Sequence, residues 1–581
     1  MNIQGYDVLS AMKETPYATQ RELSARTGHC VGSVNRAVKE LTAQGFLDSD
    51  MRLTAKAEQM FAERAPRNAI ILAAGFGMRM VPINTEIPKG LLKVHGEPLI
   101  ERLIKQLHHA GIREIYVVVG FMKEQFEYLI DAYGVTLVVN PEYAVKNNLH
   151  SILRVLNYLS NSYIIPCDIW CAQNPFRERE LYSWYMVSDI PAQDSPVRVN
   201  RKMELVSAPK SGNTMIGICY LLEEQAAAVR EKIAQLCRDK RYDSGFWEEA
   251  LYHKDRMIVP ARVVSGADVV EINTYEQLRE LDGGSSSLKS DAIEVITHRL
   301  HAKPSELTGI TVLKKGMTNR SFLFSCRGRK YIMRIPGEGT DRLINRREEA
   351  AVYQAIQGRN ICDDIVYIDP VNGYKITEFL EGARVCDPQN AEDVTRCMDK
   401  LRKFHVLALT VDHTFDIFGQ IDYYESLWGG ASSVYQDYTV TKQNVQKLRA
   451  FIDAHRGRMV LTHIDAVPDN FLFVGEELRL IDWEYAGMQD PHVDIAMFCI
   501  YSLYSREQVD WLIDLYFEGR CPEETRLKIY CYIAACGLLW SNWCEYKSRL
   551  GVEFGEYALR QYRYAKDYYR IVDAALKSGK E

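Results

Sequence analysis

The spacing of apolar residues changes along the chain and divides it into differently patterned stretches. In the first 64 residues apolar side chains recur at helical spacing, which predicts helices over 20–26 and 31–44. Residues 46–53 predict two short strands around an acidic turn. This stretch is therefore expected to form a small helical domain that ends in a hairpin.

The middle of the chain carries short, continuous apolar runs instead. The runs 68–74 and 115–120 predict parallel strands, because strands covered by helices on both faces carry few polar residues. Farther along, the pattern predicts a strand, a polar turn and a strand over 312–324, followed by a third strand over 330–335. An α/β domain is therefore expected first and an α+β domain after it.

Two breaks in composition mark the predicted domain boundaries. The segments 63–67 and 283–287 lack side chains that anchor packing, and the second is a run of glycine and serine. A chain of 581 residues is also too long for one hydrophobic core. We therefore predict domains over residues 1–64, 67–282 and 290–581.

The composition is that of an ordinary globular protein. Apolar residues make up 47% of the chain and the net charge is −6, which argues against a surface built throughout for nucleic acid or anionic lipid. The N-terminus lacks a basic segment followed by an apolar core, and no apolar run approaches the roughly 18 residues of a membrane span. The 14 cysteines are scattered singly. We expect a cytoplasmic protein without membrane contact, disulfide framework or zinc site.

The first domain resembles the winged helices of bacterial transcription regulators, on its order of helix, turn, helix and hairpin. Its charges balance, and a neutral module binds DNA poorly because phosphate contacts supply most non-specific affinity. DNA binding through residues 1–64 is therefore not favoured, and a docking or regulatory role is at least as well supported. The balanced charges are Lys13, Arg21, Arg26, Arg36, Lys39, Arg52, Lys56 and Arg64 against Asp7, Glu14, Glu22, Glu40, Asp48, Asp50, Glu58 and Glu63.

A specific motif opens the middle domain. Residues 72–89 match LAAGxGxRxxPxTxxxPK, except that Asn84 stands at the threonine position. The motif resembles the sugar-phosphate nucleotidyltransferase superfamily, and the stretches 119–126 and 147–151 resemble bacterial CTP:phosphocholine cytidylyltransferases. The resemblance implies a Rossmann-like α/β fold with its phosphate loop at the carboxyl ends of parallel strands.

The same resemblance implies roles for individual residues. Arg79 would hold the departing pyrophosphate, and Lys89 would lie beside the α-phosphate of CTP, which a phosphate monoester attacks. No general base is needed, because this nucleophile is already ionised. The other implied site residues are Leu72, Ala73, Ala74, Gly75 and Gly77 for the nucleotide, Asp168 and Asn273 for Mg²⁺, and Asn147 and Ser151 for the substrate.

The last domain carries a second set of transfer residues. His463, Asp465 and Asn470 follow HxDxxxxN spacing, and a hairpin predicted after Asn470 returns Asp482 to its side. Asn470 and Asp482 would share Mg²⁺. Asp465 would accept the proton of a hydroxyl that attacks the γ-phosphate of ATP.

The strands before this motif follow the order of a kinase small lobe. A polar turn ending at Asn319 would cover the nucleotide phosphates, and Arg334 on the third strand would reach them. Glu348 or Glu349 on the next helix would hold that arginine, and helical spacing favours Glu349. The domain is therefore predicted to be bilobal and protein-kinase-like.

The stretch 481–487, IDWEYAG, resembles the choline/ethanolamine kinase family within the aminoglycoside-phosphotransferase-like fold. The resemblance implies arginine at position 334, where many kinases have lysine, and support of the catalytic loop by Asp494. A quaternary ammonium has no hydrogen to donate, so aromatic faces and a carboxylate would hold it. For that role we predict Trp483 and Glu484, with Trp540 and Trp543 as further candidates.

Together the two sites predict a bifunctional enzyme. Choline and ATP would give phosphocholine, and phosphocholine and CTP would give CDP-choline and pyrophosphate. The same reactions on ethanolamine, or cytidylyl transfer to an aminophosphonate, are alternatives. A transcription regulator that senses ligands is an alternative of another class, against which intact Lys89, Asp465 and Asp482 argue, because a sensor need not keep transfer residues.

Overall fold

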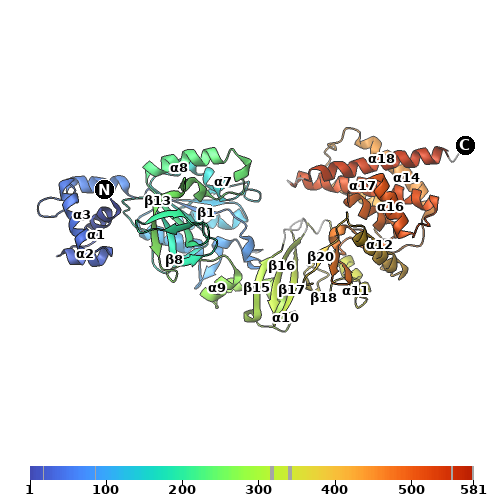
Figure 1. The fold of residues 1–581 in the computed structure, drawn as a ribbon, viewed down its shortest axis with the longest axis horizontal. Helices are drawn as coiled ribbons and strands as arrows, with labels where there is room; N and C mark the ends of the chain where they lie inside the picture. The colour runs from blue at the N-terminus through green and yellow to red at the C-terminus, as the bar shows by residue number, and fades with distance from the viewer. Residues whose placement is uncertain are drawn as a thin grey trace. The chain divides into compact units, whose positions relative to one another are not determined.

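The computed structural model describes residues 1–578 apart from 18, 86, 314–318, 338, 339, 341, 342, 551 and 553, and describes 78, 85, 319 and 320 by their backbone alone. The chain forms two compact units, Met1–Glu294 and Val295–Glu581. The first unit holds a winged helix and an α/β domain, and the second holds an α+β domain (Figure 1). The fold class predicted from the sequence is confirmed. Among the residues described, every helix is too short or too polar to cross a membrane.

The winged helix forms where the sequence supplies caps and an apolar face. The side chain of Thr19 accepts a hydrogen bond from the amide of Glu22, and Gly28, with φ 68°, ends the same helix, so the chain turns into the next one. Val34 and Leu41 are buried on the inner face of that second helix. The elements are α1 (Ile3–Glu14), α2 (Gln20–Thr27), α3 (Val31–Ala43), a bridge between Leu47 and Leu53, and α4 (Ala55–Arg64).

The winged helix shares its hydrophobic core with the α/β domain. Leu181 of the α/β domain is 1% exposed and packs into the core of the winged helix. The Tyr182 hydroxyl donates to Asp7 Oδ1 at 3.0 Å, and Arg64 Nη1 donates to the Leu181 carbonyl at 2.7 Å. The Tyr220 hydroxyl donates to the Arg64 carbonyl at 2.6 Å. These contacts make the two domains one unit.

The α/β domain is built on one mixed sheet of order β5-β4-β1-β6-β11-β8-β13-β10-β9. Its first four strands in that order are parallel, and β11 joins them antiparallel. The strands are β1 (Asn68–Ala73), β4 (Glu114–Val119), β5 (Thr136–Val139), β6 (Ser162–Pro166), β8 (Trp184–Ala192), β9 (Val197–Val199), β10 (Glu204–Ser207), β11 (Gly212–Leu221) and β13 (Arg256–Val264).

Helices cover both faces of this sheet, so its central strands are apolar on both sides. Ile71 and Val117 belong to the core on the face of α5 (Leu99–His109), whereas Ile70 and Val118 belong to the core on the face of α7 (Asn148–Leu153) and α8 (Glu223–Leu236). Beyond the sheet edge, β7 (Ile169–Cys171) pairs with β14 (Val269–Glu271), and α9 (Tyr275–Leu281) follows. The β7–β14 pair brings residues 168 and 271–273 to the carboxyl end of β1.

The boundary between the two units falls within α10 (Asp291–Arg299), and the second unit contains an antiparallel sheet of order β15-β16-β17-β19-β18. Helix α11 (Arg346–Ile356) buries Glu349, Val352 and Tyr353. The strands are β15 (Leu307–Val312), β16 (Asn319–Cys326), β17 (Arg329–Pro336), β18 (Ile365–Ile368) and β19 (Lys375–Glu378).

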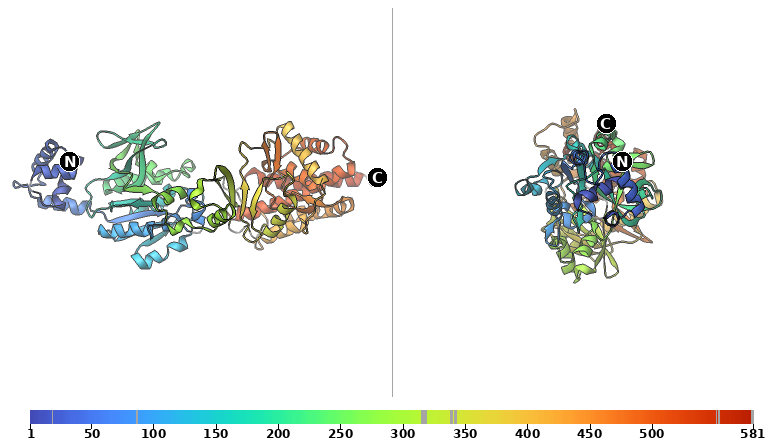
Figure 2. Two further views of the ribbon diagram at one scale, coloured as in Figure 1. Left: turned by 90° about the horizontal axis from the view of Figure 1, so that it is seen from below. Right: turned by 90° about the vertical axis from the view of Figure 1, so that its left-hand side faces the viewer.

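The rest of this unit is a lobe made mostly of helices, coloured orange to red in Figure 2. Its helix α17 (Glu523–Arg549) has buried residues on all sides over most of its length. Small hairpins at its edge present the catalytic loop. The remaining helices are α12 (Ala391–Val406), α13 (Ile417–Ser426), α14 (Tyr438–His455), α15 (His492–Tyr501), α16 (Arg506–Tyr516) and α18 (Glu556–Ser578). The hairpin strands are β20 (Arg384–Val385), β21 (Val460–Thr462), β22 (Phe471–Val474), β23 (Glu477–Leu480) and β24 (Gly487–Gln489).

Truncating Leu181 tests the shared core. Leu181→Ala is expected to weaken the docking of the winged helix by about 2–5 kcal/mol, the usual cost of truncating a buried leucine to alanine. Hydrogen exchange should then accelerate in α1 and α4. Ile190→Ala, at a side chain that is 54% exposed, serves as the control and should leave exchange in those helices unchanged. Equal exchange in both variants would contradict the shared core.

Candidate active sites

The phosphate loop of the first site leaves the carboxyl end of β1. The Phe121 amide donates to the Ala74 carbonyl at 3.1 Å, which fixes the start of the loop. Gly77 has φ 65°, and a Cβ there would lie 3.3 Å from Lys89 Cδ. The sequence-predicted nucleotide residues Leu72, Ala73, Ala74, Gly75 and Gly77 therefore lie at one end of the strand, close to Lys89.

Asn84 supports this loop, a role that motif matching missed. Its Nδ2 donates to the carbonyls of Phe76 at 2.6 Å and Gly77 at 2.9 Å, and the residue is fully buried. A threonine hydroxyl has one hydrogen to donate, whereas the amide has two. The presence of Asn84 at the threonine position of the motif was the sequence signal for this role. Its side chain holds the loop through two hydrogen bonds.

Lys89 and Arg79 meet at one oxygen atom. Lys89 Nζ donates to Asn273 Oδ1 at 2.8 Å, and Arg79 Nη2 donates to the same atom at 2.8 Å. Lys89 also forms an ion pair with Asp168, and both side chains are almost buried, at 11% and 13% exposed. The structure therefore brings together Lys89, Arg79 and Asp168, as predicted for a site that binds phosphate groups.

In this structure the side-chain oxygen of Asn273 faces two cations, and its role as a magnesium ligand stays a prediction. An amide oxygen has two lone pairs, and the hydrogen bonds from Lys89 and Arg79 use both. Asn273 therefore orients the two cations. The position was recognised from the motif, but the direction of its oxygen depends on Lys89, 184 residues away.

Glu271 supplies the carboxylate that Asn273 lacks. Glu271 pairs with Ile169 in the β7–β14 register, next to Asp168. Burial raises the pKa of Glu271, and the charge of Asp168 raises it further. Asp168 Oδ1 is enclosed and accepts no hydrogen bond from the described residues. Two neighbouring carboxylates with an unused oxygen fit the oxygen ligands that Mg²⁺ prefers.

The predicted substrate residues Asn147 and Ser151 serve the fold in this structure. Asn147 caps α7 through its Oδ1, which accepts from the Asn148 amide at 2.8 Å, while its Nδ2 donates to the Ser244 carbonyl at 3.0 Å. Ser151 Oγ accepts from Asn140 Nδ2 at 3.1 Å. These hydrogen bonds account for both side chains locally, and substrate binding by them stays a prediction.

A further carboxyl group of this domain, Glu248, was not recognised from the sequence. Its Oε1 accepts from the Tyr185 hydroxyl at 3.2 Å, and its enclosed Oε2 has no hydrogen-bond partner among the described residues. Burial raises the pKa of Glu248 to about 7, and the charge of Glu271 contributes. A cation beside Glu248 would stabilise its ionised form.

Asp494 holds the loop that carries His463 and Asp465 in the second unit. Its carboxylate accepts the amides of His463 at 3.0 Å and Ile464 at 2.7 Å, and His405 Nε2 lies 3.0 Å from Oδ2. Asp494 is fully buried, and Ile464 adopts φ 69°. Two charge-assisted hydrogen bonds therefore fix the loop in a backbone conformation that a β-branched residue rarely adopts.

Asp465, Asn470 and Asp482 converge as the hairpin predicts. The Ile481 amide donates to the Asn470 carbonyl at 2.9 Å, which brings Asp482 beside Asn470. Asn470 Nδ2 donates to Asp465 Oδ2 at 3.2 Å. Burial raises the pKa of Asp465 to about 7, and the charge of Asp482 adds to the shift. Asn470 and Asp482 offer the oxygen donors that Mg²⁺ requires.

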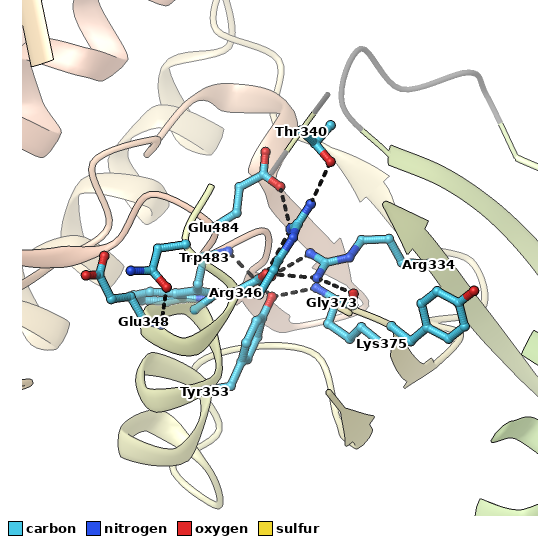
Figure 3. A network of polar contacts seen from close by, with 12 residues as sticks. Arg334, Thr340, Arg346, Glu348, Tyr353, Gly373, Lys375, Trp483 and Glu484 are labelled. Atoms are coloured by element: carbon cyan, nitrogen blue, oxygen red, sulfur yellow. Dashed lines mark hydrogen bonds and ion pairs between the residues drawn. The ribbon is translucent and has the colours of Figure 1, made fainter. Parts of the chain in front are cut away.

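A buried ion pair links the sheet to α11 (Figure 3). Both guanidinium Nη atoms of Arg334 donate to Glu349, and Nη2 also donates to the Gly373 carbonyl at 3.0 Å. Burial alone would raise the pKa of Glu349, but Arg334 lowers it to about 2. The structure thus pairs Arg334 with Glu349, whereas Glu348 lies away from it. The turn 314–318 and the side chain of Asn319 lie outside the described residues.

Comparison with known proteins identifies both units. Residues 69–183 match the MobA-like NTP transferase domain, residues 310–518 match choline/ethanolamine kinase, and residues 1–48 match the winged helix-turn-helix DNA-binding family. The choline-phosphate cytidylyltransferase of Streptococcus pneumoniae is 33% identical over 37% of this chain and 96% of its own length. The chain belongs to the choline-phosphate cytidylyltransferase family.

Further relatives cover each domain. The 2-aminoethylphosphonate cytidylyltransferase of Lancefieldella rimae is 30% identical, over 37% of this chain and 92% of its own. Protein LicA of Haemophilus influenzae is 28% identical, over 46% of this chain and 81% of its own. The chain is therefore an enzyme with a cytidylyltransferase domain and a choline/ethanolamine kinase domain, as the sequence predicted.

In the kinase domain, Trp483 does not face a ligand, contrary to its predicted role. Its side chain is 0% exposed, its Nε1 donates to the Leu480 carbonyl at 2.7 Å, and its ring packs edge-on against Phe404 and His463. Trp483 is therefore a core residue. The carboxylate of Glu484 lies 3.9 Å from Arg346, and its contact with the ammonium group stays a prediction.

The aromatic residues near Asp465 are Tyr485 and its neighbours. The Tyr485 ring lies 5.6 Å from Trp540, which lies 5.5 Å from Trp543, both edge-on. Burial raises the pKa values of Tyr485, Tyr501 and Tyr557, and the charge of Asp465 contributes to each shift. The Tyr501 hydroxyl donates to Asp469 Oδ2 at 2.9 Å, four residues after Asp465. Tyr501 and Tyr557 were not predicted, because nothing separates them in sequence from the other tyrosines of this lobe.

Gly77 of the phosphate loop and a glycine outside the site provide a matched test. Gly77→Ala is expected to cost about 1–2 kcal/mol, because its backbone is left-handed and the added Cβ meets Lys89. The affinity for CTP, measured by calorimetry, should fall about tenfold. Gly32, on α3 of the winged helix, has open space around it, so Gly32→Ala is the control and should leave the affinity within about twofold. Equal losses in both variants would contradict this assignment.

Proposed function

We propose that the chain makes CDP-choline in two consecutive steps. The kinase domain transfers the γ-phosphate of ATP to the hydroxyl of choline. The cytidylyltransferase domain then joins phosphocholine to the CMP part of CTP and releases pyrophosphate. The observation that carries the proposal is that one chain contains the transfer residues of both reactions, and the product of the first is the nucleophile of the second.

In the kinase step Asp465 accepts the proton of the choline hydroxyl as the oxygen attacks phosphorus. Its carboxylate is oriented by Asn470, and the loop that carries it is fixed by Asp494. Arg334, held by Glu349, contacts the ATP phosphates. Asn470 and Asp482 would hold magnesium, which neutralises charge on the phosphate oxygens.

In the cytidylyl step no proton needs to leave the nucleophile, so cations carry the catalysis. Lys89 stabilises charge at the α-phosphate, and Arg79 stabilises the departing pyrophosphate. Asn273 aims both cations, because its oxygen accepts a hydrogen bond from each. Asp168 and Glu271 would hold magnesium, which would neutralise charge on the phosphate oxygens of the nucleotide.

Choline is the proposed acceptor because aromatic side chains lie beside Asp465. A trimethylammonium group binds aromatic faces, and Tyr485, Trp540 and Trp543 supply them. In the cytidylyltransferase domain, Glu248 is the proposed counter-charge for the same head group. Ethanolamine and an aminophosphonate are the competing substrates, the latter because of the similarity to a 2-aminoethylphosphonate cytidylyltransferase.

We propose a docking or regulatory role for the winged helix. Its charges balance, and its core includes Leu181 of the cytidylyltransferase domain. DNA binding, which the family of residues 1–48 implies, is the second candidate. A regulator without catalysis is not favoured, because both sets of transfer residues are complete.

Phosphorus NMR of the chain with magnesium, ATP, CTP and choline tests both steps. The wild type is expected to form CDP-choline. Lys89→Ala should slow CDP-choline formation about 10²–10³-fold, as for loss of a transition-state contact, while phosphocholine accumulates. Asp465→Ala should abolish both products, and added phosphocholine should restore CDP-choline formation.

Parallel reactions with ethanolamine and with 2-aminoethylphosphonate decide the substrate. Turnover of either in preference to choline and phosphocholine would overturn the choice of choline and leave the reaction types standing. If Lys89→Ala and Asp465→Ala slowed the same step, the assignment of one reaction to each domain would be wrong.

The aromatic cage has its own test in Trp540→Leu, which keeps an apolar side chain and removes the π face. The KM for choline is expected to rise about tenfold, because a desolvated cation–π contact contributes about 1–2 kcal/mol. The KM for ATP should stay unchanged. Trp511, which is 38% exposed, gives the matched control Trp511→Leu, with both KM values unchanged. A rise in the KM for ATP alone would contradict the cage.

A further inference from the structure

Arg346 is a buried cation to which the two proposed reactions give no role. It is the first residue of α11 and is 5% exposed. Its Nη1 lies 3.0 Å from Glu349 Oε2 and 3.9 Å from Glu484 Oε2, and its Nη2 donates to Thr340 Oγ1 at 3.3 Å (Figure 3). One guanidinium therefore contacts carboxylates from two separate segments.

These contacts complete a chain of alternating charges. Arg334 on β17 pairs with Glu349, Glu349 pairs with Arg346, and Arg346 pairs with Glu484. The side chains of Glu349 and Glu484 are 0% and 4% exposed. Without Arg346, Glu484 would lose this counter-charge while buried, which is costly in a medium of low dielectric constant.

Glu484 ties this chain of charges to the reacting groups. It follows Asp482 by two residues and immediately precedes Tyr485, so one short segment carries a proposed metal ligand and a wall of the proposed choline cage. A cavity of about 570 Å³ borders Arg346, Glu484 and Tyr485. On the side of the cavity, segment 482–485 therefore has few side chains packed against it. The ion pair between Arg346 and Glu484 holds the segment on that side.

Gly373 makes room for the bridge. It has φ 72°, and a Cβ on it would lie 2.7 Å from both Cδ and Nε of Arg346. Its carbonyl also accepts from Arg334. The turn between β18 and β19 therefore packs on Arg346 and holds Arg334, so the two arginines share one support.

We propose that Arg346 is a positioning residue that couples the nucleotide clamp to the metal-binding segment of the kinase domain. Through Glu349 it contacts the partner of Arg334, and through Glu484 it holds Asp482 and Tyr485 in place. Kinases require that the helix glutamate pair and the metal-binding aspartate be in position together. Arg346 links the two by contacting Glu349 and by contacting Glu484, two residues after Asp482. The inference rests on the proposed kinase activity.

The test compares Arg346→Gln with Arg347→Gln in the full chain. Arg347 is the next residue of α11 and is exposed, so the control removes an equal charge outside the bridge. Arg346→Gln is expected to lower kcat for choline phosphorylation at least about tenfold and to raise severalfold the Mg²⁺ concentration needed for half-maximal rate. Arg347→Gln should stay within about twofold of the wild type in both.

Coupling predicts that the effects do not multiply. Arg346→Gln combined with Glu484→Gln should be no slower than Arg346→Gln alone, because both remove the same bridge. Multiplying effects, or a wild-type Mg²⁺ requirement in Arg346→Gln, would overturn the proposal. A purely structural residue would lower the amount of active enzyme without changing the Mg²⁺ requirement.

Further measurements keep the outcome decisive. If hydrogen exchange shows that Arg346→Gln unfolds α17, Arg346→Lys takes its place, since it keeps the charge but lacks the planar fork for two carboxylates. A raised Mg²⁺ requirement supports the coupling and an unchanged one refutes it. If the wild type does not phosphorylate choline, the proposed function fails, and the Mg²⁺ dependence of ATP affinity in wild type and Arg346→Gln decides the coupling by itself.

Discussion

Both sites depend on one electrostatic constraint: a pocket for polyphosphates needs cations, and a cation out of water needs a carboxylate beside it. Lys89 is paired with Asp168, 79 residues away, and Arg334 is paired with Glu349 on the following helix. Each pair joins segments that the sheets bring together. The folds therefore place the anionic partner so that the cation stays charged, and the same pairs orient the atoms that we propose to contact the substrate.

The catalytic constellations were predictable from the sequence because they lie in short motifs whose backbone path is nearly fixed. A strand that ends in small residues predicts the position of Lys89 and Arg79, and a two-strand hairpin leaves little freedom for Asp482 relative to Asn470. The pairing of Arg334 with Glu349, in preference to Glu348, follows from helical spacing alone. In these cases local geometry and the residue types give the same answer.

The sequence did not predict the directions of some side chains in the two sites. These directions depend on partners that are distant in sequence. Trp483 lies between two carboxylates of an active-site segment, yet Asp482 adopts φ 66°, and Trp483 packs in the core against Phe404. Asn273 was recognised from the motif, but its oxygen faces two cations, which the motif does not predict. Periodicity describes regular helices and strands, and it carries no information on the irregular turns in which these residues lie.

The shared core at the junction near Arg64 limits how the domains of this chain can be lost during evolution. Because Leu181 completes the interior of the winged helix, a polypeptide that began at residue 67 would expose Leu181 and leave Tyr182 without Asp7. Newly exposed apolar surface favours aggregation. Deletion of the winged helix during evolution would therefore require compensating polar substitutions at Leu181 and Tyr182. A domain that shared no core with its neighbour could be deleted without such substitutions.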